Sequence, residues 1–229
     1  TPVRNWDNKY WGTMTLRTAL IESRNVPAVK LFNEVGADKI EDFLSRLGIQ
    51  YAKIQQANAI SSNTVDQDGT KYGMSSLKLA AAYAALSNGG TYNEPQYVNK
   101  IVFADGSEEV EAFKTPGIKA MEETTAYMVT DILKGVIESG TGYNPTIQGL
   151  YQAGKTGTSN YTEEELEALN AASTVFPDST FVGYTVNYSL AVWTGYRDQK
   201  TPITNEYSGV ASDVYREVMQ HVSASVVNE

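Results

Sequence analysis

Two kinds of hydrophobic pattern follow one another along this chain, and their order limits the folds that it can adopt. The apolar residues first recur with helical spacing, most clearly over residues 122–138. A strand is then expected at about 151–159, followed by two apolar strands at 180–186 and 189–196. A closing helix is expected at about 208–222. Helices first, then strands and a final helix, predict an α+β fold with an antiparallel sheet flanked by helices.

The helical spacing predicts several helices before the strands, at residues 14–22, 26–35, 37–47, 76–88 and 122–138. The Ala-rich helix at 76–88 has little polar surface and is expected to be buried. Two alternating runs around Asp105-Gly106 predict a hairpin over 96–113, whereas residues 49–73 are polar and irregular. The closing helix places one apolar set on a single face, namely Val210, Val214, Tyr215, Val218 and Val222.

Composition excludes several classes of function. The net charge of −9 argues against nucleic acid as a partner, and 41% hydrophobic residues suffice for one large domain or two small ones. No run is apolar enough to span a membrane, and the absence of Cys excludes disulfides and thiol catalysis. The single histidine, His221, is expected on the surface of a helix, so a Ser-His-Asp triad is not favoured. A lysine with a lowered pKa would be the natural base for acyl transfer.

A motif of one cation, two hydroxyls and a glycine, Lys155-Thr156-Gly157-Thr158, lies in the strand expected at 151–159. Alternation along a strand would put Lys155 and Gly157 on one face and the threonines on the other. A glycine within a strand often marks the close approach of a ligand, and an edge strand can bind an extended peptide. The motif therefore predicts a site for an anionic group such as a terminal carboxylate. The alternative is an exposed strand end with a turn glycine.

A second motif, Ser23-Arg24-Asn25, separates two expected helices. Serine can relay a proton, and the amide of Asn25 offers both a donor and an acceptor to a substrate amide. Helix capping is the alternative, because Ser and Asn are favoured at helix ends. Arg24 is expected to be solvated or to form a structural salt bridge. Ser-x-Asn followed by Lys-Thr-Gly is part of the signature of penicillin-binding proteins and serine β-lactamases.

The resemblance to a known family extends over nearly the whole chain. The chain resembles the transpeptidase domain of class A penicillin-binding proteins, and most closely the 1A type of Gram-positive cocci. The resemblance is carried by the stretches IESRNVPAVKLFNEVG, LAAAYAALSNGGTYNEPQYVNKIV, AMEETTAYMVTDILKGVIESGTG, QAGKTGTSNYT and FVGYTVNYSLAVWTGY. It implies the penicillin-binding and serine β-lactamase-like transpeptidase fold, with residues 1–229 as the C-terminal part of that domain.

The resemblance also implies a reaction and roles for single residues. A serine would attack the D-Ala-D-Ala carbonyl of a peptidoglycan stem peptide, and a second stem peptide would resolve the acyl-enzyme into a cross-link, whereas β-lactams would remain bound. Ser23 and Lys155 would relay protons, and Asn25 would bind the amide of the donor peptide. The side chains of Lys155, Thr156 and Thr158, beside Gly157, would hold its carboxylate. The backbone N–H of Thr158 would supply half of the oxyanion hole.

The chain departs from the family at the nucleophile. In the family, Ser-x-x-Lys precedes Ser-x-Asn, but no serine lies before Ser23. The only Ser/Thr-x-x-Lys begins at Ser75, in the wrong order, and Ser75 is expected to cap a helix. The hypothesis is therefore that the chain is a fragment. The attacking serine, its lysine base, a membrane anchor and any glycosyltransferase domain would then lie on an upstream piece, which can stay assembled after a cut in an exposed loop.

The expected partners are thus peptidoglycan stem peptides, β-lactam antibiotics and the upstream fragment, with no cofactor, no metal and no nucleic acid. The expected location is the extracytoplasmic face of the bacterial membrane. The acidic insert at 160–179 is expected to be a solvated loop beside the cleft; alternatively it shapes access, with Tyr161 and Phe176 lining it. Two other functions stay open: a serine β-lactamase or D,D-carboxypeptidase of the same fold, and an inert binding or scaffold module.

Overall fold

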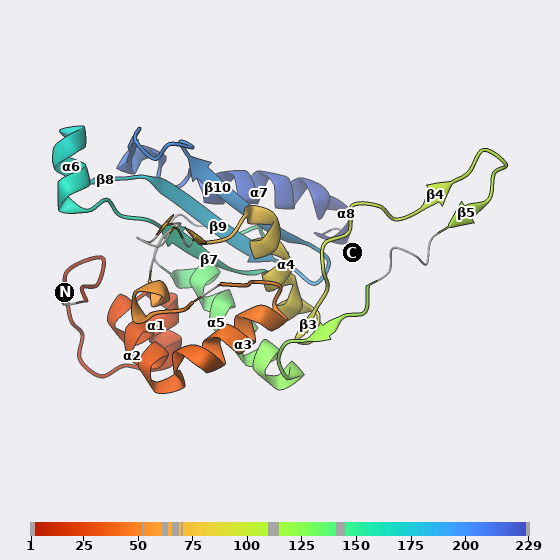
Figure 1. The fold of residues 1–229 in the computed structure, drawn as a ribbon, viewed down its shortest axis with the longest axis horizontal. Coiled ribbons are helices and arrows are strands. Elements are labelled where there is room, and N and C mark those ends of the chain that lie inside the picture. The colour runs from red at the N-terminus through yellow and green to blue at the C-terminus, as the bar shows by residue number, and fades with distance from the viewer. Residues whose placement is uncertain are drawn as a thin grey trace.

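The computed structural model describes residues 3–51, 53–60, 64–65, 69, 71–109, 115–140 and 145–227. At its centre lies a three-stranded antiparallel sheet with the order β10-β9-β7. Its strands are Ala153–Thr158 (β7), Asp178–Tyr184 (β9) and Ser189–Gly195 (β10). Figure 1 shows the sheet between helix α7 (Val210–Val222) on one face and helices α4 (Ser76–Ser87) and α5 (Glu123–Ser139) on the other. The predicted α+β class, with a flanked antiparallel sheet, is confirmed.

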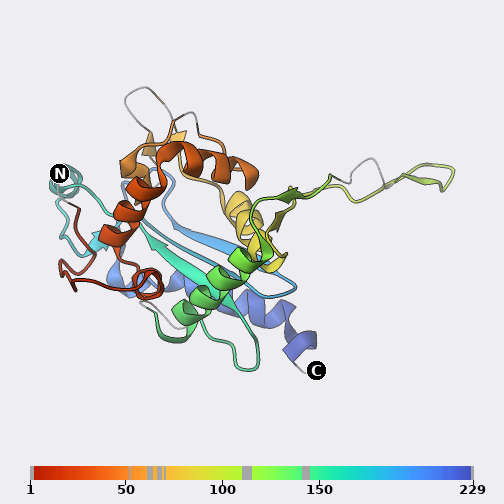
Figure 2. The ribbon, with the colours of Figure 1, turned by 90° about the horizontal axis from the view of Figure 1, so that it is seen from below.

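The first three helices are α1 (Leu16–Ile21), α2 (Asn25–Val35) and α3 (Ala37–Arg46). They follow one another along one side of the molecule in Figure 2: α1 packs against α5, α2 against α1, and α3 against α2. Each lies within a few residues of its predicted range, because local signals mark its ends. Thr15 caps α1 by accepting a hydrogen bond from the Thr18 N–H, and Gly36, with φ of 88°, separates α2 from α3.

Two clusters join the sheet to the helices on either side of it. On one face, Tyr184 packs with Leu133 and Val136 of α5. On the other, Phe181 packs with Tyr215 and Met219 of α7. Full burial of such side chains stabilises the fold by about 1.5–3 kcal/mol each. The sheet therefore provides a rigid base for whatever its β7 edge carries.

The apolar set predicted for one face of α7 coincides with its buried face only at Tyr215. The buried residues are Ala211, Ser212, Tyr215 and Met219. Val214, Val218 and Val222 are 41%, 40% and 38% exposed and form a stripe at the surface. Helical spacing fits both the buried residues and the exposed valines, and the position of the sheet decides which set is buried. The expected burial of α4 is likewise only partial, since its fully buried residues are Ala82 and Ala85.

The segment between α4 and α5 forms the predicted hairpin and extends away from the body of the molecule (Figures 1 and 2). Strands Ile101–Val102 (β4) and Glu108–Glu109 (β5) pair within it. At its base, Thr91–Tyr92 (β3) pairs with Ile118–Lys119 (β6), which the sequence did not predict.

The short elements that remain lie in loops or, in the case of α8, directly after α7. They are Gln56–Ala59 (η1), Thr64–Val65 (β1), Lys71–Tyr72 (β2), Glu163–Leu169 (α6), Val175–Phe176 (β8), Ile203–Thr204 (β11), Asn205–Tyr207 (η3) and Ala224–Val227 (α8). The region expected to be irregular, 49–73, thus holds η1 and the β1–β2 pair. Among the described residues, no helix has the length and apolar character needed to cross a membrane.

Candidate active site

The Lys-Thr-Gly-Thr motif occupies the last four residues of β7, at the edge of the sheet. Lys155 lies opposite Val182 of β9, and Thr158 lies opposite Ser179. No strand in the described part of the chain pairs with the other edge of β7. The N–H of Ser159 donates to Asp178 of β9, with N···O of 3.4 Å. Backbone groups alternate along an antiparallel strand, so the N–H of Thr158 points toward the open edge.

Ser23 lies in the turn between α1 and α2, and its backbone is strained. Its N–H donates to the Leu20 carbonyl at 3.2 Å, and the next N–H, that of Arg24, donates to the Ala19 carbonyl at 2.9 Å. This pair of bonds ends a helix with a left-handed residue, which is usually glycine. Ser23 takes that position with φ of 50°, at a cost of about 1–2 kcal/mol for a residue with a Cβ. Such strain in a polar residue is typical of functional sites.

A single hydrogen bond joins the two motifs. The Lys155 ammonium donates to Ser23 Oγ at 2.9 Å, across 132 residues of sequence. It also donates to the carbonyl oxygen of Thr156 at 3.1 Å and to Thr156 Oγ1 at 3.2 Å. All three acceptors are neutral, so the cation has no carboxylate partner in the described part of the chain. Its charge remains available to an anionic ligand.

Burial lowers the pKa of Lys155 to about 8, because desolvation disfavours the charged amine. A lysine with this pKa can both release and accept a proton near neutral pH. The neighbouring Ser23 hydroxyl accepts a hydrogen bond from the lysine, which leaves its own hydrogen free to be donated to another acceptor. The pair therefore has the chemistry of a proton relay.

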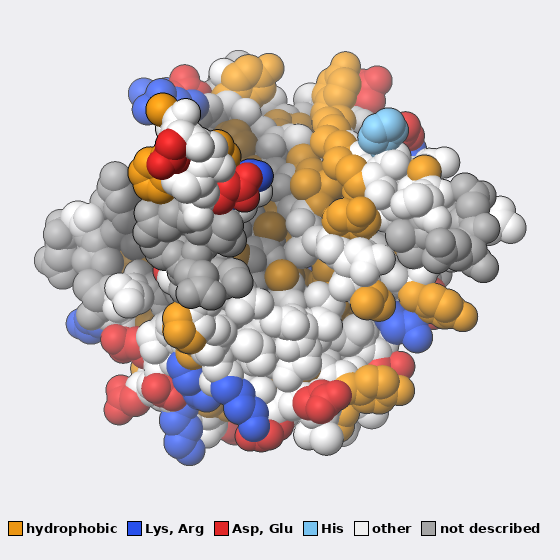
Figure 3. Space-filling view, turned by 90° about the vertical axis from the view of Figure 1, so that its right-hand side faces the viewer, with side chains coloured by type: hydrophobic (Ala, Val, Ile, Leu, Met, Phe, Trp, Pro, Cys, Tyr) orange, Lys and Arg blue, Asp and Glu red, His pale blue; other side chains and the backbone are white. Residues whose placement is uncertain are grey.

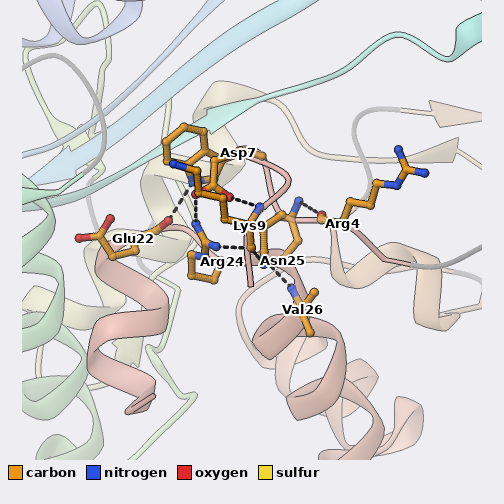
Figure 4. A network of polar contacts seen from close by, with 9 residues as sticks. Arg4, Asp7, Lys9, Glu22, Arg24, Asn25 and Val26 are labelled. Atoms are coloured by element: carbon orange, nitrogen blue, oxygen red, sulfur yellow. Dashed lines mark hydrogen bonds and ion pairs between the residues drawn. The ribbon is translucent and has the colours of Figure 1, made fainter. Parts of the chain in front are cut away.

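Arg24, the middle residue of the second motif, is buried, so the expectation of a solvated side chain is wrong and that of a structural salt bridge is confirmed. Only 2% of Arg24 is exposed, and its guanidinium donates to Asp7 Oδ2 at 2.9 Å. This bond lowers the pKa of the Asp7 carboxyl below its ordinary value. Asn25 begins α2, and its Nδ2 donates to the Arg4 carbonyl at 2.9 Å. Figure 4 shows this network.

A cleft of about 1010 Å³ connects these residues. It is lined by all the predicted site residues, namely Ser23, Asn25, Lys155, Thr156, Gly157 and Thr158. Apolar side chains from α1, α2, α4 and α5 line much of the rest, for example Leu20, Leu31 and Leu79. Polar residues outside the two predicted motifs, such as Asn160 and Asp178, also line it. A cleft with an apolar wall and a few convergent polar groups is the usual form of a small-molecule or peptide site.

Other residues singled out in the sequence lie elsewhere. Ser75 caps α4, because its Oγ accepts a hydrogen bond from the Lys78 N–H at 3.3 Å, as predicted. His221 is exposed near the end of α7, beside a band of hydrophobic side chains in Figure 3. Neither Tyr161 nor Phe176 is among the described residues that line the cleft. Phe176 is buried instead, in the strand that pairs with β11.

Two sets of side chains beside the site were missed. Asp178 is 3% exposed and accepts hydrogen bonds from Ser159, the residue after the first motif, and from Gln199 Nε2 at 3.2 Å. Near the start of the chain, Asp7 accepts a hydrogen bond from Arg24 of the second motif, and Asn5 accepts one from the N–H of Val26, just after it. No local pattern in the sequence marks these residues, since each contact spans 17 residues or more.

No group of three or more His, Cys, Asp and Glu residues that could hold a metal ion occurs among the described residues. The cleft is instead lined by one lysine, the three amides of Asn25, Asn58 and Asn160, several hydroxyls, and the charged residues Arg24 and Asp178. These groups suit the binding of a carboxylate and an amide, together with proton transfer.

The sequence matches the family described as the penicillin binding protein transpeptidase domain over residues 1–220. Penicillin-binding protein 1A of Streptococcus pneumoniae (strain ATCC BAA-255 / R6) is 54% identical over 224 residues, which are 97% of this chain and 31% of that protein. Penicillin-binding protein 1A/1B of Bacillus subtilis (strain 168) is 40% identical over 225 residues, 96% of this chain and 24% of that protein. The chain thus spans about a third, or less, of the length of these relatives.

Solved structures share the fold. The penicillin-binding protein PonA1 from Mycobacterium tuberculosis aligns with a TM-score of 0.77 and 22% identity, covering 96% of this chain and 59% of that chain. The D,D-transpeptidase domain of a peptidoglycan glycosyltransferase from Eggerthella lenta gives 0.70 and 22%, covering 96% and 56%. The fold expected from the sequence is therefore confirmed.

Proposed function

Because this chain belongs to the penicillin-binding protein transpeptidase domain family, we propose that it supplies two of the motifs of a D,D-transpeptidase. The enzyme cross-links peptidoglycan stem peptides through a serine acyl-enzyme and is inhibited by β-lactams. The observation that carries this proposal is the hydrogen bond of 2.9 Å from Lys155 to Ser23, which joins motifs 132 residues apart in the sequence.

The proton relay follows from this bond. When the scissile amide of the donor peptide breaks, its leaving nitrogen needs a proton. Ser23 gives its hydroxyl proton to that nitrogen and takes one from Lys155. The lysine then recovers a proton when the acceptor amine attacks the acyl-enzyme. The lowered pKa of Lys155, about 8, suits an exchange in both directions.

Binding of the donor peptide uses the open edge of β7. The positive charge of Lys155 and the hydroxyls of Thr156 and Thr158 hold the terminal carboxylate. The N–H of Thr158, directed toward the open edge, stabilises the oxyanion, a contribution whose loss commonly slows a reaction about 100- to 1,000-fold. The side chain of Asn25 donates one N–H to the Arg4 carbonyl. Its oxygen and its second N–H hold the amide of the donor peptide.

The nucleophilic serine and its lysine base belong to a segment upstream of this chain. Three observations support this part of the proposal. The chain covers about a third of the relatives' length. It covers little more than half of the solved chains that share its fold. Its one Ser-x-x-Lys begins at Ser75, which caps α4.

We extend the proposal to the complete protein. The relative from Eggerthella lenta is a peptidoglycan glycosyltransferase with a D,D-transpeptidase domain. This supports a glycosyltransferase domain in the part of the complete protein that lies outside this chain. A segment outside this chain would then anchor the protein at the extracytoplasmic face of the membrane, where its substrate lies.

Acylation of the complete protein by a fluorescent penicillin tests this function. Ser23→Ala and Asn25→Ala are expected to slow acylation at least about tenfold, because each removes a group that meets the acyl donor. Ser45→Ala and Asn99→Ala, at exposed positions away from the cleft, are the matched controls. Equal rates in all four variants would exclude the proposed roles. Rapid release of the bound label would indicate a hydrolase instead.

A further inference from the structure

The segment of residues 4–9, here called the N-terminal segment, contacts the residues on both sides of Ser23. The Trp6 indole N–H donates to the Glu22 carbonyl at 3.2 Å, just before Ser23. The Asn5 side chain accepts from the Val26 N–H at 3.1 Å, just after the motif. Figure 4 shows how these chain segments, far apart in sequence, converge.

Arg24 is the centre of these contacts. Its guanidinium donates to Asp7 Oδ2 at 2.9 Å and to the Lys9 carbonyl at 2.6 Å, and it stacks on the Trp11 ring, 4.3 Å from its centroid. The side chain of Arg24 is fully buried, and its Nε has no hydrogen-bond partner among the described residues. A buried cation of this kind depends on its carboxylate, because removing one partner leaves an uncompensated charge.

Asn5 acts as a helix cap supplied from outside the helix. Arg24 is the N-cap residue of α2 and gives no side-chain cap of its own. Asn5 Oδ1 takes that role for the Val26 N–H, while Asn5 Nδ2 donates to the Lys9 carbonyl at 2.7 Å. The Asn5 side chain thus bonds α2 and also another residue of its own segment. Asn5 is 5% exposed, so water does not readily replace it.

Ser23 itself takes an unfavourable backbone conformation, with φ of 50°. A residue held in this way persists only where its surroundings fix it from several sides. The N-terminal segment bonds Glu22, Arg24, Asn25 and Val26, which are the neighbours of Ser23 in sequence. Their positions determine where the Ser23 hydroxyl meets Lys155.

We propose that Asn5 and Asp7 are positioning residues of the transpeptidase site, which hold Ser23 and Asn25 in place for acyl transfer. This inference rests on the proposed function, since positioning has a measurable meaning only where Ser23 and Asn25 act. Neither Asn5 nor Asp7 lines the cleft, so both act through Arg24 and the start of α2. Displacement of a catalytic group by about 1 Å can slow a reaction about 100-fold.

The test compares Asn5→Ala and Asp7→Asn in the complete protein with matched controls at the surface. Asn99→Ala is the control for the amide, and Asp213→Asn is the control for the ion pair, because Asp213 pairs with Arg216 on the exposed side of α7. A fluorescent penicillin gives two quantities, namely the acylation rate of competent sites and the final acylated fraction. Both variants of the N-terminal segment are expected to lower the rate about 10- to 100-fold. The controls are expected to stay within about twofold.

The two quantities separate positioning from folding. A lower acylated fraction with an unchanged rate would mean a purely structural role and would overturn the inference. A Ser23→Ala background adds a second criterion: the effect of Asn5→Ala should shrink there to a few-fold, and an undiminished effect also contradicts the inference. Should Asp7→Asn not fold, Asn5→Ala carries the test alone, because it leaves the buried ion pair in place. Failure of the unmodified protein to react would refute the proposed function instead.

Discussion

The two halves of the candidate site are held by different means. Lys155, Thr156 and Thr158 lie in a strand whose backbone pairs with β9 along its whole length. Ser23 lies in the turn between α1 and α2 in a left-handed conformation, and Asn25 is the first residue of α2. The residues around them form hydrogen bonds with side chains about 20 residues away in the sequence. For example, the Val26 N–H donates to the side chain of Asn5, 21 residues before it. One half is fixed by a regular ladder and the other by a few specific bonds.

This difference bears on how each half tolerates change. A ladder distributes the support over many backbone hydrogen bonds, which the loss of a single side chain leaves in place. A turn held by a buried cation and a distant cap depends on each of those contacts. Substitutions of residues outside the cleft should therefore impair the Ser23 half more readily than the β7 half.

The largest effect is expected from Lys155→Ala in the complete protein. This change removes both the relay and the charge for the carboxylate, and acylation by penicillin should slow about 100- to 10,000-fold. Lys155→Arg is the matched variant, because arginine keeps the charge but does not release its proton. Acylation at the normal rate in Lys155→Arg would show that the charge alone matters.

Ser23→Gly should separate stability from activity in the turn. Glycine adopts a φ of 50° without strain, so the free energy of unfolding should rise by about 1 kcal/mol. The lost hydroxyl should slow acylation about 100-fold. Denaturant unfolding and penicillin acylation measure the two quantities. A less stable Ser23→Gly variant would mean that the Ser23 hydroxyl, with its bond from Lys155, contributes more than the strain costs.

The lowered pKa of Lys155 predicts a dependence of stability on pH. The folded pKa is about 8 and the ordinary value is 10.5, so between these values the unfolded chain binds more protons than the folded one. The free energy of unfolding should therefore rise with pH in this window, by up to about 3 kcal/mol relative to a Lys155→Met variant. The comparison with Lys155→Met removes the other titrating groups. If the free energy of unfolding depended on pH in the same way in both proteins, the lowered pKa of Lys155 would be refuted.

Two glycines of β7 provide a matched pair within the ladder. A Cβ at Gly154 would lie 2.7 Å from the Val182 carbonyl oxygen, whereas at Gly157 the nearest atom is 3.7 Å away. Gly154→Ala should destabilise the protein by about 1–3 kcal/mol, and Gly157→Ala by less than about 0.5 kcal/mol. If Gly157→Ala nevertheless slows acylation, the absence of a side chain at position 157 is needed for the ligand to bind. Equal stability of the two variants would contradict the geometry of the strand.

The sequence predicted the helices, the central strands and the cleft-lining residues of both motifs. Periodicity, capping residues and the motifs themselves are local signals, and they located α5, α7 and β7 within a few residues. The buried face of α7 was not predictable, because two apolar stripes compete and the sheet selects one. The contacts of Asn5, Asp7 and Asp178 were also missed, since side-chain bonds between distant segments leave no periodic trace.

The most direct test of the account is the intact mass of the complete protein and of this chain alone after incubation with penicillin, followed by peptide mapping. The account predicts one adduct on the complete protein, on a serine of a Ser-x-x-Lys motif upstream of residue 1, and none on the isolated chain of 25.1 kDa. An adduct within residues 1–229, at Ser75 or any other serine, would contradict it.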